Sequence, residues 1–186
     1  MGKRVCPWWL GYFLASPVRR WFTQDPNEIV APYVRPGSTV LEPGPGMGYF
    51  TLDLARLVGQ SGRVIAVDVQ PKMIAGLKKR LAKQQLLDRV EARTASENSL
   101  ELEELATSVD FTLALAVVHE MPDDQKFFDE VSAASKPGAR LLLAEPEGHV
   151  KAEAFSAELE HAAQAGFRVV ERPKIRRCEA ALLQKQ

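Results

Sequence analysis

The stretch VLEPGPGMGYF, from Val40 to Phe50, carries three glycines at alternate positions directly after an apolar run and an acidic residue. Glycine loses more backbone freedom on folding than any other residue, so three of them in one loop indicate a backbone that must approach something closely. The segment 35–43 is predicted to be a turn and a strand, and 49–59 an amphipathic helix. This order of strand, glycine loop and helix is typical of cofactor-binding sites.

Alternating strand and helix signals continue to the C-terminus. Further strands are predicted over 62–69, 89–93, 109–118 and 139–146, and helices over 71–87, 99–106, 123–135 and 151–166. A helix over 24–34 precedes the glycine loop, with Asp25 as its N-cap and Pro26 in its first turn. Two last strands, 167–172 and 179–184, are close enough in sequence to be antiparallel neighbours. The pattern predicts an α/β fold, a doubly wound and mainly parallel sheet with helices on both faces.

Composition bounds the class of protein. A chain of 186 residues is expected to form one sheet domain, 36–186, preceded by an N-terminal helical and aromatic cap, 1–35. The 24 Lys and Arg residues balance the 24 Asp and Glu residues, so the chain has no net positive charge. This argues against electrostatic binding of nucleic acid or anionic lipid by the protein as a whole. Two cysteines are too few for a disulfide framework or a thiolate metal site, so we expect a cytoplasmic protein.

The first 17 residues, MGKRVCPWWLGYFLASP, combine a basic start with a short apolar stretch. A cleaved signal is disfavoured, because Pro7 interrupts the stretch and adjacent tryptophans are unusual in one. The stretch is also too short to span a bilayer, so no stable membrane insertion is expected. This segment carries an aromatic cluster of Trp8, Trp9, Tyr12 and Phe13. We expect the cluster to pack on the domain.

The residues around the glycine loop indicate which cofactor it holds. Asp68 ends the next predicted strand, and a carboxylate at that strand end is suited to both hydroxyls of a ribose. The dinucleotide pattern G-x-G-x-x-G would need a glycine where the chain has Tyr49. Glu42 would repel a pyrophosphate but attract a cationic group. The spacing therefore favours a nucleoside-bearing cofactor with a cationic end, and disfavours a nicotinamide-dependent reductase.

Four segments in this order carry a family resemblance: VLEPGPGMGYFT, VIAVDVQPKMI, VDFTLALAVVHEMPD and KPGARLLLAEP. Together they resemble the class I S-adenosylmethionine-dependent methyltransferases, in particular the small ubiquinone/menaquinone-biosynthesis-like type. The resemblance covers the chain from about Pro36 to its end. It implies a Rossmann-like, seven-stranded sheet whose last strand is antiparallel. It also implies methyl transfer by in-line displacement, with S-adenosyl-L-homocysteine as the product.

The resemblance assigns roles to the residues of the glycine loop. Gly44, Gly46 and Gly48 are similar to the loop that lies under the methionine and ribose of the cofactor. Glu42 resembles the acidic residue that faces the methionyl amino group.

The resemblance also extends to the ribose and adenine. Asp68 resembles the carboxylate that binds the ribose, and Val69 lies beside the adenine in this comparison. Relatives often have Gly-Asp-Ala where this chain has RTASEN, and Ser96 stands in the place of the aspartate. This departure puts the usual carboxylate contact to the adenine amino group in question. The further candidates for cofactor contacts are Ala95, Ser96, Ala114 and Leu115.

His119 is the candidate for acid–base chemistry. Methyl transfer from a sulfonium needs alignment and exclusion of water, and a base only when the acceptor must lose a proton. His119 follows the apolar fourth strand, and histidine accepts a proton near neutral pH. Alternatively, its side chain only bonds the loop. Glu120 is a candidate to orient His119 or to hold the substrate. A metal site of His119, Glu145 and His149 is conceivable, but no metal is expected.

The neutral charge and the aromatic segment favour a small, partly apolar methyl acceptor. Its candidate contacts are Trp8, Trp9, Tyr12, Tyr49 and Glu120. Arsenic compounds are disfavoured because they require several thiols. DNA is disfavoured because the chain has neither the Asn/Asp-Pro-Pro-aromatic nor the Pro-Cys motif after the fourth strand.

RNA is disfavoured by the balanced charge, although a basic cluster near the C-terminus leaves it open. The cluster consists of Arg172, Lys174, Arg176 and Arg177. A non-catalytic S-adenosylmethionine-binding or partner protein of the same fold is the alternative function. The sequence leaves the oligomeric state open.

Overall fold

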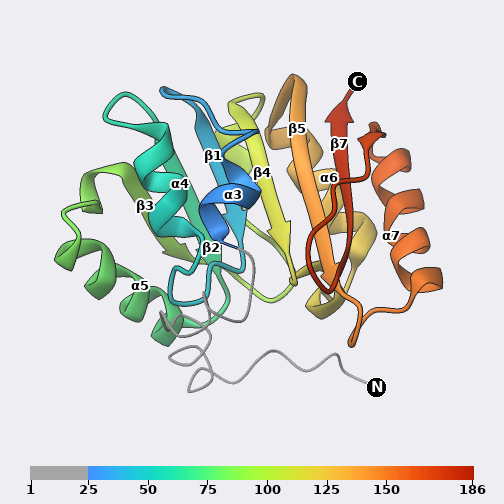
Figure 1. Cartoon of the computed structure of the whole chain (residues 1–186), viewed down its shortest axis with the longest axis horizontal. Helices are drawn as coiled ribbons and strands as arrows, with labels where there is room; N and C mark the ends of the chain where they lie inside the picture. The colour runs from blue at the N-terminus through green and yellow to red at the C-terminus, as the bar shows by residue number, and fades with distance from the viewer. Residues whose placement is uncertain (1–24) are drawn as a thin grey trace. The chain divides into compact units, whose positions relative to one another are not determined.

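The computed structural model of the chain describes residues 25–186 (Figure 1). The predicted aromatic cluster of Trp8, Trp9, Tyr12 and Phe13 lies outside these residues. The chain divides into two compact units. In the described range, the first unit extends to Ala95 and the second runs from Ser96 to Gln186.

The first unit begins with the short helix α3, Pro26–Val30. Asp25 is its N-cap, as predicted, and the Asp25 side chain accepts a hydrogen bond from the backbone N–H of Asn27. The helix is shorter than the predicted 24–34. Pro32 explains the early end, because a proline has no backbone N–H to donate to the carbonyl four residues earlier, at Glu28.

Three parallel strands form the sheet of the first unit. They are β1 (Thr39–Pro43), β2 (Arg63–Asp68) and β3 (Val90–Thr94). Strand β2 pairs in parallel with both β1 and β3, with Leu41 opposite Ile65. Strands β1 and β2 are almost fully buried, as expected for a parallel sheet covered by helices.

Two helices connect these strands: α4 (Thr51–Val58) and α5 (Pro71–Lys83). Each has one apolar face: α4 packs on β1 and β2, and α5 packs on β2 and β3. The 3-10 turn η1 (Leu87–Arg89) leads into β3.

The second unit contains four strands and two helices. The strands are β4 (Val109–Leu115), β5 (Ser135–Pro146), β6 (Phe167–Glu171) and β7 (Cys178–Lys185), and the helices are α6 (Asp124–Ala134) and α7 (Ala152–Gln164). β4 and β5 are parallel, whereas β7 is antiparallel to both β5 and β6. The predicted antiparallel pair at the C-terminus is confirmed.

The predicted helix over 99–106 is wrong in extent. Only the 3-10 turn η2 (Glu103–Leu105) forms there. Glu101 has φ = 55° and Thr107 has φ = 50°, both in the left-handed region that a right-handed helix cannot contain. These two residues confine the helical turn on either side.

The strand order of the sheet is β3-β2-β1-β4-β5-β7-β6. The seven strands and the antiparallel C-terminal strands confirm the predicted Rossmann-like, doubly wound fold. No helix between residues 25 and 186 is long and apolar enough to cross a bilayer.

Candidate active site

The glycine loop lies between β1 and α4 and has an unusual backbone conformation. Gly44, Gly46 and Gly48 all have positive φ, at 66°, 54° and 84°. A side chain at Gly48 would clash, because its Cβ would lie 2.5 Å from Cδ1 of Leu77. A Cβ at Gly46 would meet no atom within 4 Å. Gly48 is thus required by packing inside the unit, whereas the space at Gly46 is open to a bound group.

Asp68 joins the end of β2 to this loop. Its carboxylate is buried and accepts hydrogen bonds from two backbone N–H groups: Oδ2 from Gly46 over 3.2 Å, and Oδ1 from Gln70 over 2.8 Å. The N–H of Gly44 donates to the carbonyl of Val67 over 2.8 Å. The carboxylate therefore fixes the loop against the strand end. The bond from Gly46 to Asp68 was not predicted from the sequence.

Glu42 is a buried carboxyl group at the end of β1. Only 3 % of the residue is exposed, and burial raises its pKa to about 8. The side chain of Thr51 lowers that pKa, and the charge of Asp68 raises it further. Oε2 of Glu42 has no hydrogen-bond partner among the described residues. A buried carboxyl oxygen without a partner costs free energy, so this position calls for a cationic or hydrogen-bonding partner from outside residues 25–186.

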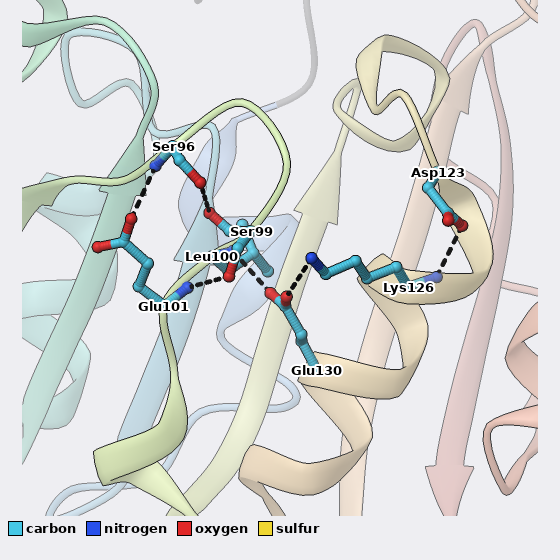
Figure 2. Close-up of polar contacts among 7 residues, drawn as sticks. All are labelled: Ser96, Ser99, Leu100, Glu101, Asp123, Lys126 and Glu130. Carbon is cyan, nitrogen blue, oxygen red and sulfur yellow. Dashed lines mark hydrogen bonds and ion pairs between the residues drawn. The ribbon is translucent and has the colours of Figure 1, made fainter.

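The candidate adenine contacts are Val69, Ala95 and Ser96. Val69 is half-buried directly after β2, and the N–H of Ala95 donates to the carbonyl of Asp68 over 3.2 Å. Ser96 is exposed at the start of the second unit. Its N–H donates to Oε1 of Glu101 over 3.1 Å (Figure 2). A carboxylate therefore does lie beside Ser96, and it is supplied by Glu101.

The loop that carries Ser96 is attached to helix α6 (Figure 2). The N–H of Leu100 donates to Oε2 of Glu130 over 2.6 Å. Lys126 lies 3.8 Å from the other oxygen of Glu130, and its own N–H donates to the N-cap residue Asp123 over 2.9 Å. These contacts give the loop a defined backbone course.

His119 and Glu145 form a close pair in the second unit. His119 lies in the 3-10 turn η3 (Val118–Glu120) after β4, and Glu145 is next to the last residue of β5. Nδ1 of His119 lies 2.5 Å from Oε2 of the fully buried Glu145. Oε1 of Glu145 accepts hydrogen bonds from the N–H groups of Val118, over 2.8 Å, and His119, over 3.3 Å.

The surroundings of the His119 imidazole make it a stronger base than a free histidine. The pKa of His119 is raised, first by the hydrogen bond to Glu145, against an opposing effect of burial. The negative charges of Glu145, Glu120 and Glu158 raise it further. The ring of His149 lies edge-on, with its centroid 5.9 Å away.

The role of Glu145 was missed at the sequence level, where it was considered only as a metal ligand. The available signal was a lone acid at the end of an otherwise apolar strand. Within residues 25–186, no group of three or more His, Cys, Asp or Glu side chains is arranged to hold a metal ion.

The remaining predicted site residues occupy varied positions. Ala114 is buried in β4, and Leu115 at its end is half-buried. Tyr49 is half-buried and packs edge-on against Phe50, with ring centroids 5.2 Å apart. The basic residues of the predicted cluster, Arg172, Lys174, Arg176 and Arg177, are exposed in the connection between β6 and β7.

Comparisons with known proteins agree on one family. A family model described as a methyltransferase domain matches residues 35–181. The chain is 33% identical over 110 residues to an arsenite methyltransferase of Halobacterium salinarum, covering 59% of this chain and 27% of that protein. It is 30% identical over 125 residues to the ubiquinone/menaquinone biosynthesis C-methyltransferase UbiE of a Marinomonas species, covering 66% of this chain and 49% of that protein. The chain thus spans half or less of the length of these relatives.

A solved structure is similar over its whole length. The crystal structure of a SAM-dependent methyltransferase from Aquifex aeolicus has a TM-score of 0.86 and 26% sequence identity. The match covers 98% of this chain and 100% of that one.

Proposed function

The chain belongs to the class I S-adenosylmethionine-dependent methyltransferases, and we propose that it transfers the methyl group of S-adenosylmethionine to a small-molecule acceptor. The resemblance carried by the four sequence motifs is confirmed at the level of family and fold, and S-adenosylmethionine is the cofactor of that family.

One observation in particular supports this proposal. Glu42 presents a buried carboxyl oxygen without a partner among residues 25–186, next to a glycine loop where a Cβ at Gly46 would meet no described atom within 4 Å. The amino group of the methionine part of S-adenosylmethionine is a cation with several hydrogen-bond donors. It would supply the partner that Glu42 lacks, so the residues present fit the cofactor.

The chain's own groups would hold the cofactor in the following way. Asp68 would accept hydrogen bonds from the ribose, the loop from Gly44 to Gly48 would lie under the ribose and methionine, and Glu42 would take the amino group. Contacts from Val69, Ala95, Ser96, Ala114 and Leu115 remain predictions. When bound, S-adenosylmethionine supplies a methyl group on a sulfonium, an activated leaving group. The protein contributes alignment and exclusion of water.

A small acceptor is favoured by the neutral charge of the chain. The names of the relatives point the same way, since one is an arsenite methyltransferase and others act in ubiquinone and menaquinone biosynthesis. An arsenic acceptor is not part of the proposal, because the chain has only Cys6 and Cys178. Trp8, Trp9, Tyr12, Tyr49 and Glu120 remain predicted acceptor contacts, and a cytoplasmic location is proposed on the low cysteine content.

Calorimetry with three ligands tests the cofactor. S-adenosylmethionine and S-adenosylhomocysteine should bind, and NAD should not. Turnover is then tested by incubating the protein with S-adenosylmethionine and small-molecule mixtures, and following the gain of one methyl group by mass spectrometry. Cofactor binding without any methylated product from a broad mixture would favour the non-catalytic alternative, and tight NAD binding would refute the proposal.

A further inference from the structure

We propose that Glu145 holds the imidazole of His119 with Nδ1–H toward the carboxylate, and that Nε2 then takes a proton from the methyl acceptor. The acceptor would accordingly be a hydroxyl compound of the phenol or enol class. This inference rests on the proposed function, because it presupposes methyl transfer to a small-molecule acceptor. It gives His119 and Glu145 a role in that reaction.

The geometry of the pair carries the inference. The parallel register sets Leu115 of β4 opposite Ala144 of β5, so the residues that follow these two strands emerge at the same edge of the sheet. Ligands of doubly wound sheets bind beyond this edge, at the carboxyl ends of the strands. His119 and Glu145 are 26 positions apart and meet there at 2.5 Å.

Hydrogen bonding specifies which nitrogen is available. The Glu145 carboxylate takes Nδ1, and Nε2 of His119 has no hydrogen-bond partner among residues 25–186. The His119 side chain is 21 % exposed, whereas that of Glu145 is 0 % exposed. A neutral imidazole with its hydrogen on Nδ1 carries the lone pair on Nε2. The nitrogen that can accept a proton is therefore the one that is not bound to Glu145.

A purely structural reading explains only half of the contacts. Oε1 of Glu145 already bonds the backbone N–H groups of Val118 and His119, which is sufficient to anchor the turn after β4. The contact of Oε2 with Nδ1 is a further bond, made to the imidazole itself. It orients the imidazole and stabilises the imidazolium, which is what a carboxylate does for a histidine base.

The proposed step balances as follows. The O–H bond of the acceptor breaks, and its proton moves to Nε2 of His119, forming an imidazolium beside the Glu145 carboxylate. The oxygen forms a bond to the methyl carbon, the carbon–sulfur bond breaks, and its electron pair remains on sulfur as a neutral thioether. Release of the proton to water restores the neutral imidazole.

The proton step limits the class of acceptor. A phenol has a pKa of about 10, close enough to that of an imidazolium for proton transfer during the reaction. An aliphatic alcohol is a far weaker acid, and a neutral amine or an arsenic lone pair can attack without first losing a proton. Of these acceptor groups, an acidic hydroxyl is thus the one whose methylation is assisted by proton transfer to His119.

The variant Glu145→Gln separates the two readings. Gln keeps a carbonyl oxygen for the N–H groups of Val118 and His119, but presents an NH₂ donor to Nδ1. The hydrogen of the imidazole is then expected on Nε2, where the lone pair was. His149→Gln is the matched control, since His149 is exposed and is the neighbouring histidine.

Nitrogen-15 NMR of the full chain reads this change directly. In the wild type and in His149→Gln, the neutral His119 should carry its hydrogen on Nδ1. In Glu145→Gln the neutral imidazole should carry its hydrogen on Nε2. The pKa of His119 should also fall, because the hydrogen bond to Glu145 and the charge of Glu145 are lost, while Glu120, Glu158 and His149 remain around the ring. The same tautomer in the wild type and in Glu145→Gln would overturn the positioning role of Glu145.

A chromophoric phenol tests the base itself. With S-adenosylhomocysteine bound, 4-nitrocatechol should show the absorbance of its ionised form at a pH below its own pKa. The ionised fraction should be lost in His119→Gln and in Glu145→Gln, and kept in His149→Gln. No binding of the phenol, or ionisation that is independent of His119, would overturn the inference. Failure of S-adenosylhomocysteine to bind would instead refute the proposed function, while the NMR result would still decide the role of Glu145.

Discussion

The backbone N–H of Gly46 donates a hydrogen bond of 3.2 Å to Oδ2 of Asp68, the last residue of β2. A carboxylate at one strand end thereby sets the course of the glycine loop that follows the neighbouring strand. The residue expected to bind a ribose is also the residue that shapes the loop. If Asp68 binds the ribose as predicted, ligand binding and loop geometry are coupled through one side chain.

Replacing Asp68 by alanine should weaken cofactor binding strongly. Charge-assisted hydrogen bonds contribute about 1.5–3 kcal/mol each, so loss of two should raise the Kd for S-adenosylmethionine roughly a hundredfold or more. Calorimetry measures the change, and circular dichroism verifies the fold. Asp88→Ala, at an exposed position of the same unit, is the control and should bind normally. Equal affinity of Asp68→Ala and the wild type would remove Asp68 from the site.

Replacing Gly46 by alanine should impair binding more than it impairs folding. Gly59 offers a matched control, because it also has positive φ, at 69°, and no atom lies within 4 Å of a Cβ built there. Both substitutions should cost stability through backbone strain, and Gly59→Ala should cost at least as much as Gly46→Ala, because Gly59 has ψ = −165°, a conformation that almost only glycine adopts. Only Gly46→Ala should also raise the Kd for S-adenosylmethionine, since its methyl group would enter the space left for the ligand. A similar Kd in both variants would mean that the loop is only a turn.

Glu42 should make the free protein less stable as the pH rises. The folded state holds the Glu42 proton up to a pKa of about 8, whereas the unfolded chain loses it near 4.5. Folding therefore takes up a proton between these values, and stability should fall with pH across that window, by up to about 1.4 kcal/mol per unit. Urea denaturation across the pH range, compared with Glu42→Gln, measures this slope. Parallel stability profiles for the two proteins would show that Glu42 is not the group responsible.

Cofactor binding should release a proton from Glu42. At pH 7 this carboxyl group is protonated in the free protein, because its pKa is about 8. A cationic amino group beside it lowers that pKa, so binding of S-adenosylmethionine should release about one proton. Calorimetry in two buffers with different ionisation enthalpies counts the protons. Glu42→Gln should release none, and identical counts in the two proteins would place the amino group elsewhere.

The basic cluster should not be required for the reaction. In the triple variant Lys174→Gln, Arg176→Gln and Arg177→Gln, methylation of a small acceptor found in the screen should be unchanged. Arg172 is left in place because its guanidinium lies 5.7 Å from the ring centre of Phe155. Activity on RNA that is lost in the triple variant and falls steeply with salt would instead make RNA the acceptor.

Secondary structure was predictable where the signal is local. Apolar periodicity, glycine and proline located the strands and most helices, and Asp25 was identified as the N-cap of α3. The predicted helix over 99–106 was wrong in extent, because the left-handed backbone at Glu101 and Thr107 has no clear signal in residues that are not glycine.

The sequence by itself determined the family, the alternation of strands and helices, and the positions of Glu42, Asp68 and the glycine loop, because these follow from short-range patterns. Only the tertiary structure revealed the bond between Gly46 and Asp68, 22 positions apart, and that between His119 and Glu145, 26 positions apart. It also decided that Glu42 keeps its proton at neutral pH. The physical reason is that burial and long-range hydrogen bonds depend on which strand ends the parallel sheet brings to one edge, and no local stretch of sequence contains that information.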